Sequence, residues 1–255
     1  MDVYICNIGI SFNFHTKDFQ TYLAGSDDGY IYQCSYSHND QHLYAIKGHS
    51  GPVTKIRSSP FVPGIILTSS ADWTVKLWQI STTSDSKSRN AEDMRSNSMS
   101  NGISLISEFH SMNLFDSVHD IMWSSSCSTM FALVTGDGRI EVWDLSQSFI
   151  DPIYIDFGTD KGENLERLSV LFGSPCGFYD NASNSTNVSV DIYDEYQLMV
   201  TGTNDGVIEI FEIPNPKYQT HRLLKDNLGS FSKHQNQVEK LQKVIFNKIS
   251  EIDNS

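Results

Sequence analysis

The sequence predicts an all-β protein built from one hairpin unit that occurs four times. The unit is seen in YLAGSDDGYIYQC, LTSSADWTVKLW, ALVTGDGRIEVW and MVTGTNDGVIEIF, which begin at residues 22, 67, 132 and 199. Each copy has a short apolar strand, an Asp-centred turn and an alternating second strand that ends on Cys, Trp or Phe. Self-similarity with a period near 40 to 45 residues predicts a β-propeller, in which each unit is one blade.

The matching turn residues are Asp28, Asp72, Asp137 and Asp205. Three of these turns read Asp-Gly, the strongest short hairpin signal, because Gly reaches positive φ without a steric penalty. The fourth turn has Trp73 after its aspartate.

The spacing of the four aspartates approaches a regular repeat once two polar insertions are removed. Residues 81–102 are rich in Ser, Asn and charge, and residues 179–190 have a similar composition. Neither segment carries enough apolar area to offset the cost of ordering, so both are expected to be flexible loops between blades. The expected propeller covers residues 1–214, with blades at about 9–47, 48–80, 103–146 and 152–213.

Composition restricts the classes of function. The formal charge of -13 in 255 residues disfavours nucleic-acid binding, which depends on clustered Lys and Arg. No apolar run reaches the roughly 18 residues of a membrane span. The four cysteines are widely spaced, and neither they nor the histidines show metal-ligand spacing, so we expect free thiols in a reducing compartment and no metal or cofactor.

The unit from Gly48 to Gln79 carries a known pattern. It begins with Gly-His, and the unit after it ends on the Trp-Asp dipeptide at Trp143. In this the chain resembles the WD-repeat family. The resemblance implies a buried hydrogen-bonded chain within the blade, formed by His49, Thr68, Asp72 and Trp78. In the other blades Asp28, Asp137, Asp205, Trp143 and Phe211 stand at equivalent structural positions.

A hydroxyl, a histidine and a carboxylate also suggest a nucleophilic triad. A triad hydroxyl faces a pocket with an oxyanion donor nearby. Thr68 lies inside a strand, and the chain has no Gly-x-Ser-x-Gly nucleophile elbow. We therefore expect the set to satisfy its own donors and acceptors inside the blade, and we do not expect an enzyme.

The first two units together show a narrower resemblance. The segments GSDDGYIYQCS and SADWTV resemble the propeller of axonemal dynein intermediate chains. The form GHSGPV at residues 48–53 is most similar to intermediate chains of the two-headed inner-arm dynein.

The dynein resemblance implies a non-catalytic scaffold in the cytoplasm and the ciliary axoneme. Its blades would bind the tail of a dynein heavy chain next to a second intermediate chain and support arm assembly and motility. Light chains would bind an N-terminal extension that is absent here, so no light-chain binding is expected. The alternative is a general WD-repeat adaptor in another cytoplasmic complex.

The family closes a ring of about seven blades, so the resemblance also implies that this chain corresponds to the C-terminal part of a propeller. Either the chain is a truncated product, or the remaining blades come from another chain. Exposed sides of an open stack would be an aggregation hazard.

Two kinds of surface are candidates for partner binding. Residues 215–231 form a linker, and residues 232–252 form an amphipathic helix that either packs on its own blades or docks on a partner. Large aromatic and Arg residues on the turn rim are the other candidates. The candidate partner-binding residues are Trp73, Tyr30, Arg57, Phe115 and Arg139 on the blades, with Val238, Leu241, Ile245 and Ile249 on the helix.

Overall fold

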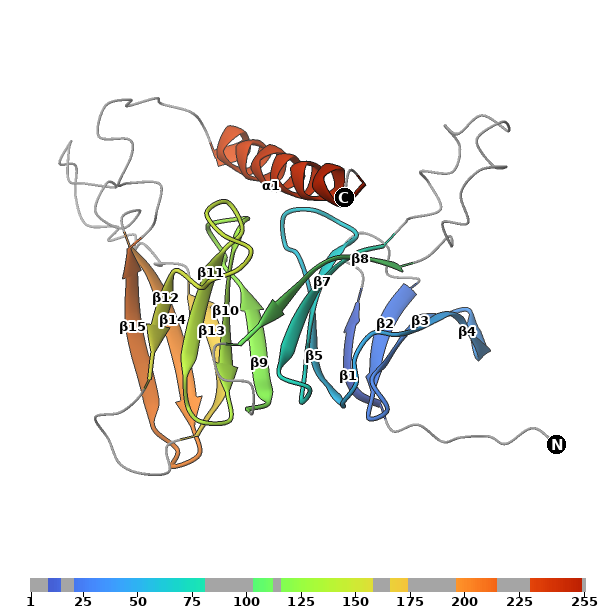
Figure 1. Ribbon diagram of the computed structural model, residues 1–255, viewed down its shortest axis with the longest axis horizontal. Helices are drawn as coiled ribbons and strands as arrows, with labels where there is room; N and C mark the ends of the chain where they lie inside the picture. The colour runs from blue at the N-terminus through green and yellow to red at the C-terminus, as the bar shows by residue number, and fades with distance from the viewer. Residues whose placement is uncertain are drawn as a thin grey trace, which may run out of the picture.

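The computed structural model describes residues 9–14, 21–80, 103–111, 116–157, 166–173, 196–214 and 230–253. Within these residues, antiparallel strands form four sheets that stand side by side and are followed by one α-helix (Figure 1). The all-β propeller-type architecture and the C-terminal helix that the sequence predicts are both present.

Each sheet is one blade. Blade one contains β1 (Gly9–Phe14), β2 (Thr21–Ser26), β3 (Tyr30–Ser35) and β4 (His38–Lys47). Blade two contains β5 (Val53–Ser58), β6 (Ile65–Ser70), β7 (Thr74–Ile80) and β8 (Ile103–His110). Blade three contains β9 (Val118–Trp123), β10 (Met130–Thr135), β11 (Ile140–Asp144) and β12 (Tyr154–Asp156). Blade four contains β13 (Arg167–Gly173), β14 (Tyr196–Thr203) and β15 (Ile208–Pro214).

The pairing of the outermost strands corrects the predicted blade boundaries. Strand β8 pairs with β7, with Thr74 opposite His110, so residues 103–110 complete blade two and do not open blade three. Strand β12 pairs with β11 in the same way, with Ile140 opposite Asp156. The repeated hairpin marks only the two middle strands of a blade, whereas the outer strand is assigned by its hydrogen bonds.

The two insertions therefore fall within blades. Residues 81–102 connect β7 to β8 of blade two, and residues 179–190 lie between β13 and β14 of blade four. Both insertions lie outside the described residues, as does most of the predicted linker.

The core lies between neighbouring blades. Middle strands β6 and β10 are buried along their whole length, as expected for strands covered on both faces. The largest cluster joins blades two and three, where Phe109, Trp123, Phe131 and Trp143 pack with ring centroids 5.2 to 6.1 Å apart. Aromatic packing of this kind contributes beyond simple area burial.

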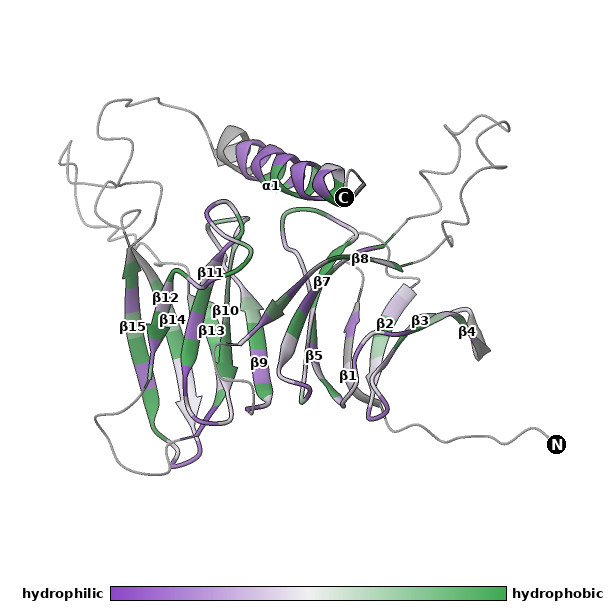
Figure 2. Ribbon diagram, viewed as in Figure 1, coloured by the Kyte–Doolittle hydropathy of each residue, from purple (hydrophilic) through white to green (hydrophobic). Residues whose placement is uncertain are grey.

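Helix α1 (Ser230–Asp253) packs across blades two and three, at the end of the blades opposite the Asp turns (Figure 1). Its hydrophobic residues face the blades and its hydrophilic residues face outward (Figure 2). Leu241 and Ile245 are buried in the core between the two blades. Ser128 fixes the position of the helix, because its backbone N–H donates to Gln237 Oε1 at 3.1 Å and its hydroxyl donates to the Gln237 carbonyl at 2.6 Å.

This packing corrects the assignment of Val238, Leu241, Ile245 and Ile249 as partner-binding residues. All four contact the protein's own core, two of them buried and two partly buried. The sequence predicts the amphipathic stripe correctly, and its apolar side packs on the protein's own blades, which is the first of the two alternatives.

Candidate functional site

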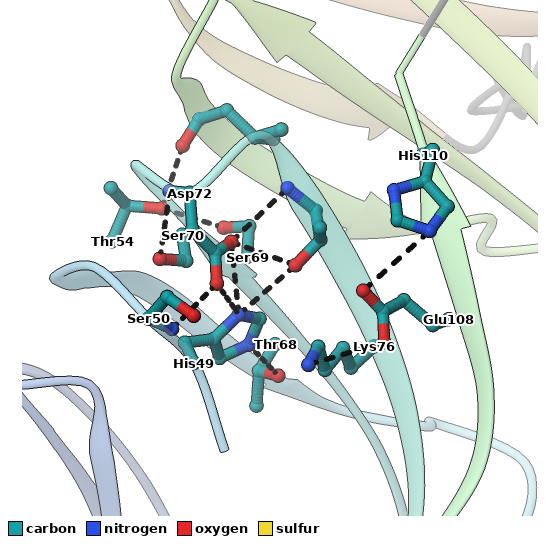
Figure 3. Close-up of polar contacts among 12 residues, drawn as sticks. His49, Ser50, Thr54, Thr68, Ser69, Ser70, Asp72, Lys76, Glu108 and His110 are labelled. Carbon is teal, nitrogen blue, oxygen red and sulfur yellow. Dashed lines mark hydrogen bonds and ion pairs between the residues drawn. The ribbon is translucent and has the colours of Figure 1, made fainter. Parts of the chain in front are cut away.

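Blade two contains a continuous chain of buried polar contacts, and Figure 3 shows its part around His49, Thr68 and Asp72. His49 Nδ1 lies 3.1 Å from Asp72 Oδ2, and His49 Nε2 lies 2.7 Å from Thr68 Oγ1. Trp78 Nε1 donates to the same Thr68 oxygen at 2.8 Å. A proton on Nδ1 satisfies every partner, because His49 then donates to Asp72 and accepts from the Thr68 hydroxyl.

The turn that follows β6 holds the Asp72 carboxylate in place. Thr74 donates to Asp72 Oδ1 from its backbone N–H at 3.2 Å and from its hydroxyl at 2.7 Å, and the Ser50 N–H donates to Oδ2 at 2.8 Å. Burial by itself raises the pKa of Asp72, but the contact with His49 and these donors outweigh it, so the net pKa lies well below the usual value.

The chain of contacts stabilises the blade. Thr68 is 0% exposed and its hydroxyl already bonds both His49 and Trp78, so the oxygen faces protein and not a pocket. Groups of three or more potential metal ligands are absent from the described part of the chain. The four side chains therefore contact one another as the sequence predicts, and their structural role stays a prediction.

The four Asp turns share one backbone conformation. The residue after each aspartate has positive φ: 83° at Gly29, 71° at Trp73, 81° at Gly138 and 78° at Gly206. Trp73 is the only non-Gly residue with positive φ among the described residues. This region costs an L-residue roughly 1–2 kcal/mol. Such strain is concentrated at functional positions, and the Trp73 side chain is 38% exposed at the rim.

The other rim candidates have different surroundings. Tyr30 is half-buried and stacks on Tyr32, with ring centroids 5.9 Å apart. Arg57 links two blades, because its Nε donates to the Ile121 carbonyl at 3.2 Å and its guanidinium lies 3.6 Å from Asp120. Phe115 lies outside the described residues.

Arg139 is not available to a partner, which corrects its assignment as an anchor. Its side chain is 2% exposed and lies 3.0 Å from Glu141 and 3.2 Å from Asp137. The guanidinium also donates to Ser111 Oγ at 2.6 Å. A buried arginine is retained only with such partners.

Two buried glutamates were missed by the sequence reasoning. In blade three, Glu141 accepts from Ser111 at 2.8 Å and from Trp143 Nε1 at 3.3 Å. In blade four, Glu209 accepts from Arg167 Nε at 2.7 Å. A shared position in the repeat could have identified them, because each glutamate stands two residues before the residue that ends the repeat, in IEVW and IEIF. Blades three and four each contain a buried ion pair, whereas blade two contains the histidine chain.

Comparisons with known proteins agree with this architecture. The family model for the WD domain, G-beta repeat, matches residues 40–79, the segment that contains the polar chain. Over 81% of its length, the chain is 36% identical to dynein axonemal intermediate chain 4 of Danio rerio. Over 64% of its length, it is 37% identical to the Xenopus laevis protein of the same name.

The chain contains a WD repeat at residues 40–79 and is similar to axonemal dynein intermediate chains. It spans about a fifth of the length of these curated relatives, 21% and 19% respectively. A crystal structure of the Swd1 β-propeller domain from Myceliophteria thermophila shares the fold, with a TM-score of 0.55 at 13% identity over 81% of this chain and 54% of that one. Helices long and apolar enough to span a membrane are absent from the described part of this chain.

Proposed function

We propose that this chain is a non-catalytic scaffold subunit of an axonemal inner-arm dynein. Its blades bind the tail of a dynein heavy chain beside a second intermediate chain, and this contact supports arm assembly and ciliary motility. The proposed sites of action are the cytoplasm and the ciliary axoneme.

The observation that carries the proposal is the extent of the similarity. The alignment to the Danio rerio axonemal intermediate chain covers 210 residues, far more than a single repeat. WD blades alone occur in many assemblies, so a match confined to residues 40–79 would favour only a general adaptor. The buried polar chain supports a scaffold role, because its groups satisfy one another and stabilise the blade.

We propose that Trp73 anchors the partner on the turn rim. An exposed tryptophan held at positive φ, where the three other blades have glycine, is costly for the blade alone. The rim also carries acidic residues: burial raises the pKa of Asp116, and the neighbouring charge of Asp137 raises this pKa further. A heavy-chain segment with Lys or Arg would complement this charge and stack on the indole.

The first experiment is affinity purification of the tagged chain from cilia and from cell bodies separately, with the bound proteins identified by mass spectrometry. Recovery of inner-arm heavy chains together with a second intermediate chain is the expected result. Recovery of cytoplasmic complexes without any dynein subunit would refute the proposal in favour of the general WD-repeat adaptor.

The Trp73 anchor is tested in the same purification. Trp73→Gly supplies the residue that stands in the other three turns, so the turn keeps its shape while the indole is lost. We expect heavy-chain recovery to fall at least tenfold. The control is Ile150→Ala, which removes an exposed apolar side chain beyond β11, at the opposite end of the blade. Equal recovery of the two variants would rule out Trp73 as the anchor.

A further inference from the structure

The first strand of each blade is an edge strand within the described residues. Strands β1, β5, β9 and β13 each stand at one end of the strand order of their sheet. These four strands lie beside one another in chain order (Figure 1). A buried backbone N–H or C=O on the free side of an edge strand needs a partner from elsewhere, because an unpaired group costs as much as a lost hydrogen bond.

Side chains of the preceding blade supply such partners. From blade one, the Ser11 hydroxyl accepts from the Ile56 N–H at 3.0 Å, and Asn13 Nδ2 donates to the Ile56 carbonyl at 3.1 Å. From blade two, the Thr54 hydroxyl donates to the Val118 carbonyl at 2.7 Å. Neighbouring first strands are therefore tied to one another by hydrogen bonds from side chain to backbone.

Asp120 in β9 contacts three blades at once, and its side chain is only 3% exposed. Its Oδ1 accepts from the Ile121 N–H of its own strand at 2.9 Å and lies 3.6 Å from the Arg57 guanidinium of blade two. Its Oδ2 accepts from the Val170 N–H of blade four at 3.2 Å. Val170 is 0% exposed, so solvent water does not replace this acceptor.

Arg57 is the solvent-accessible end of this arrangement, with a side chain that is 33% exposed. Its Nε donates to the Ile121 carbonyl at 3.2 Å, and its backbone carbonyl accepts from Trp123 Nε1 at 3.1 Å. In the described part of the chain, the polar partners of the Arg57 guanidinium all belong to blade three. Its polar connection to blade four therefore passes through the Asp120 carboxylate.

We propose that Asp120 is a coupling node that transmits the position of the Arg57 guanidinium in blade two to the first strand of blade four. The guanidinium compensates the charge of a nearly buried carboxylate and so holds the carboxylate in place. When an acidic residue of a partner draws the guanidinium away, the carboxylate loosens and the Val170 N–H loses its acceptor more often. This coupling does not depend on the dynein assignment.

The test is hydrogen exchange of the Val170 amide in the full chain, measured by NMR relative to the Leu133 amide in the buried strand β10. Arg57→Met keeps an unbranched apolar stem and removes the guanidinium. Exchange at Val170 is expected to accelerate roughly tenfold relative to Leu133, although the substitution lies in blade two. Thr54→Val is the matched control, because it also removes a contact from blade two to blade three but leaves Asp120 untouched. It is expected to leave the ratio of the two exchange rates unchanged.

A double-mutant cycle distinguishes coupling through Asp120 from general loosening of the blades. Asp120→Ala removes the acceptor of the Val170 N–H and is expected to accelerate its exchange by itself. Adding Arg57→Met to Asp120→Ala is then expected to have no further effect. An unchanged rate ratio in Arg57→Met, an equal acceleration by Thr54→Val, or a full additional effect in the Asp120→Ala background would each overturn the proposal. If Asp120→Ala does not fold, the comparison of Arg57→Met with Thr54→Val decides by itself.

Discussion

Replacement of Thr68 by valine tests the polar chain of blade two most directly. Valine has nearly the same shape as threonine, so the change removes one hydroxyl without opening a cavity. Two buried groups then lose their partner: Trp78 Nε1, 2.8 Å from the hydroxyl, and His49 Nε2, 2.7 Å from it. Thr68 is fully buried, and no water replaces the lost contacts in a site of that kind.

The magnitude follows from these two contacts. Each buried polar group without a partner costs about 1–3 kcal/mol, so two groups together cost about 2–6 kcal/mol. Burial of the added methyl group stabilises the folded state by about 0.8 kcal/mol, which offsets part of this cost. We expect the free energy of unfolding to fall by about 3 kcal/mol, which lowers Tm by roughly 6–12 °C in a protein of this size.

The assay is urea unfolding followed by circular dichroism, in the wild type and in a Trp78→Phe background. Phenylalanine lacks the indole N–H, so in this background the Thr68→Val change leaves only His49 Nε2 without a hydrogen-bond partner. Its cost should fall to about half. An unfolding free energy within about 0.5 kcal/mol of the wild type, or the same cost in both backgrounds, would refute the reasoning.

Two further predictions concern stability. Because the pKa of Asp72 is lower in the folded state than in the unfolded chain, its contribution is complete above the unfolded pKa and is lost as pH falls below about 4. Urea midpoints measured against pH should fall less steeply for Asp72→Asn than for the wild type, and equal slopes would contradict this origin. Leu241→Ala should lower the free energy of unfolding by about 2–5 kcal/mol, because Leu241 is buried between two blades. The exposed control Phe246→Ala should change the free energy of unfolding by less than about 0.5 kcal/mol. Similar losses for Leu241→Ala and Phe246→Ala would show that the apolar face of α1 does not hold the helix on the blades.

Local patterns in the sequence were enough to predict the repeated hairpins, whereas the polar chain of blade two was implied by the resemblance to the WD-repeat family. The Asp turn, the alternating strand after it and the Gly-His pair each occupy a few neighbouring residues, and their conformations depend mainly on local sterics and hydrogen bonding. The resemblance implies His49, Thr68, Asp72 and Trp78 as one set, because each occupies a fixed position in the repeat. Glu141 and Glu209 were missed because a single charged residue in an alternating strand normally faces solvent.

Tertiary structure alone decided where the outer strands belong and what each face contacts. Residues 103–110 read equally well as the end of one blade or the start of the next, and only the hydrogen bonds between β7 and β8 assign them. Arg139 resembles a rim anchor in the sequence, but the approach of Ser111 and Glu141 buries it. Alternation along a strand fixes which residues share a face. It does not encode whether another blade covers that face, as with Ile140, or leaves it bare, as with Ile208, because burial depends on residues distant in the chain.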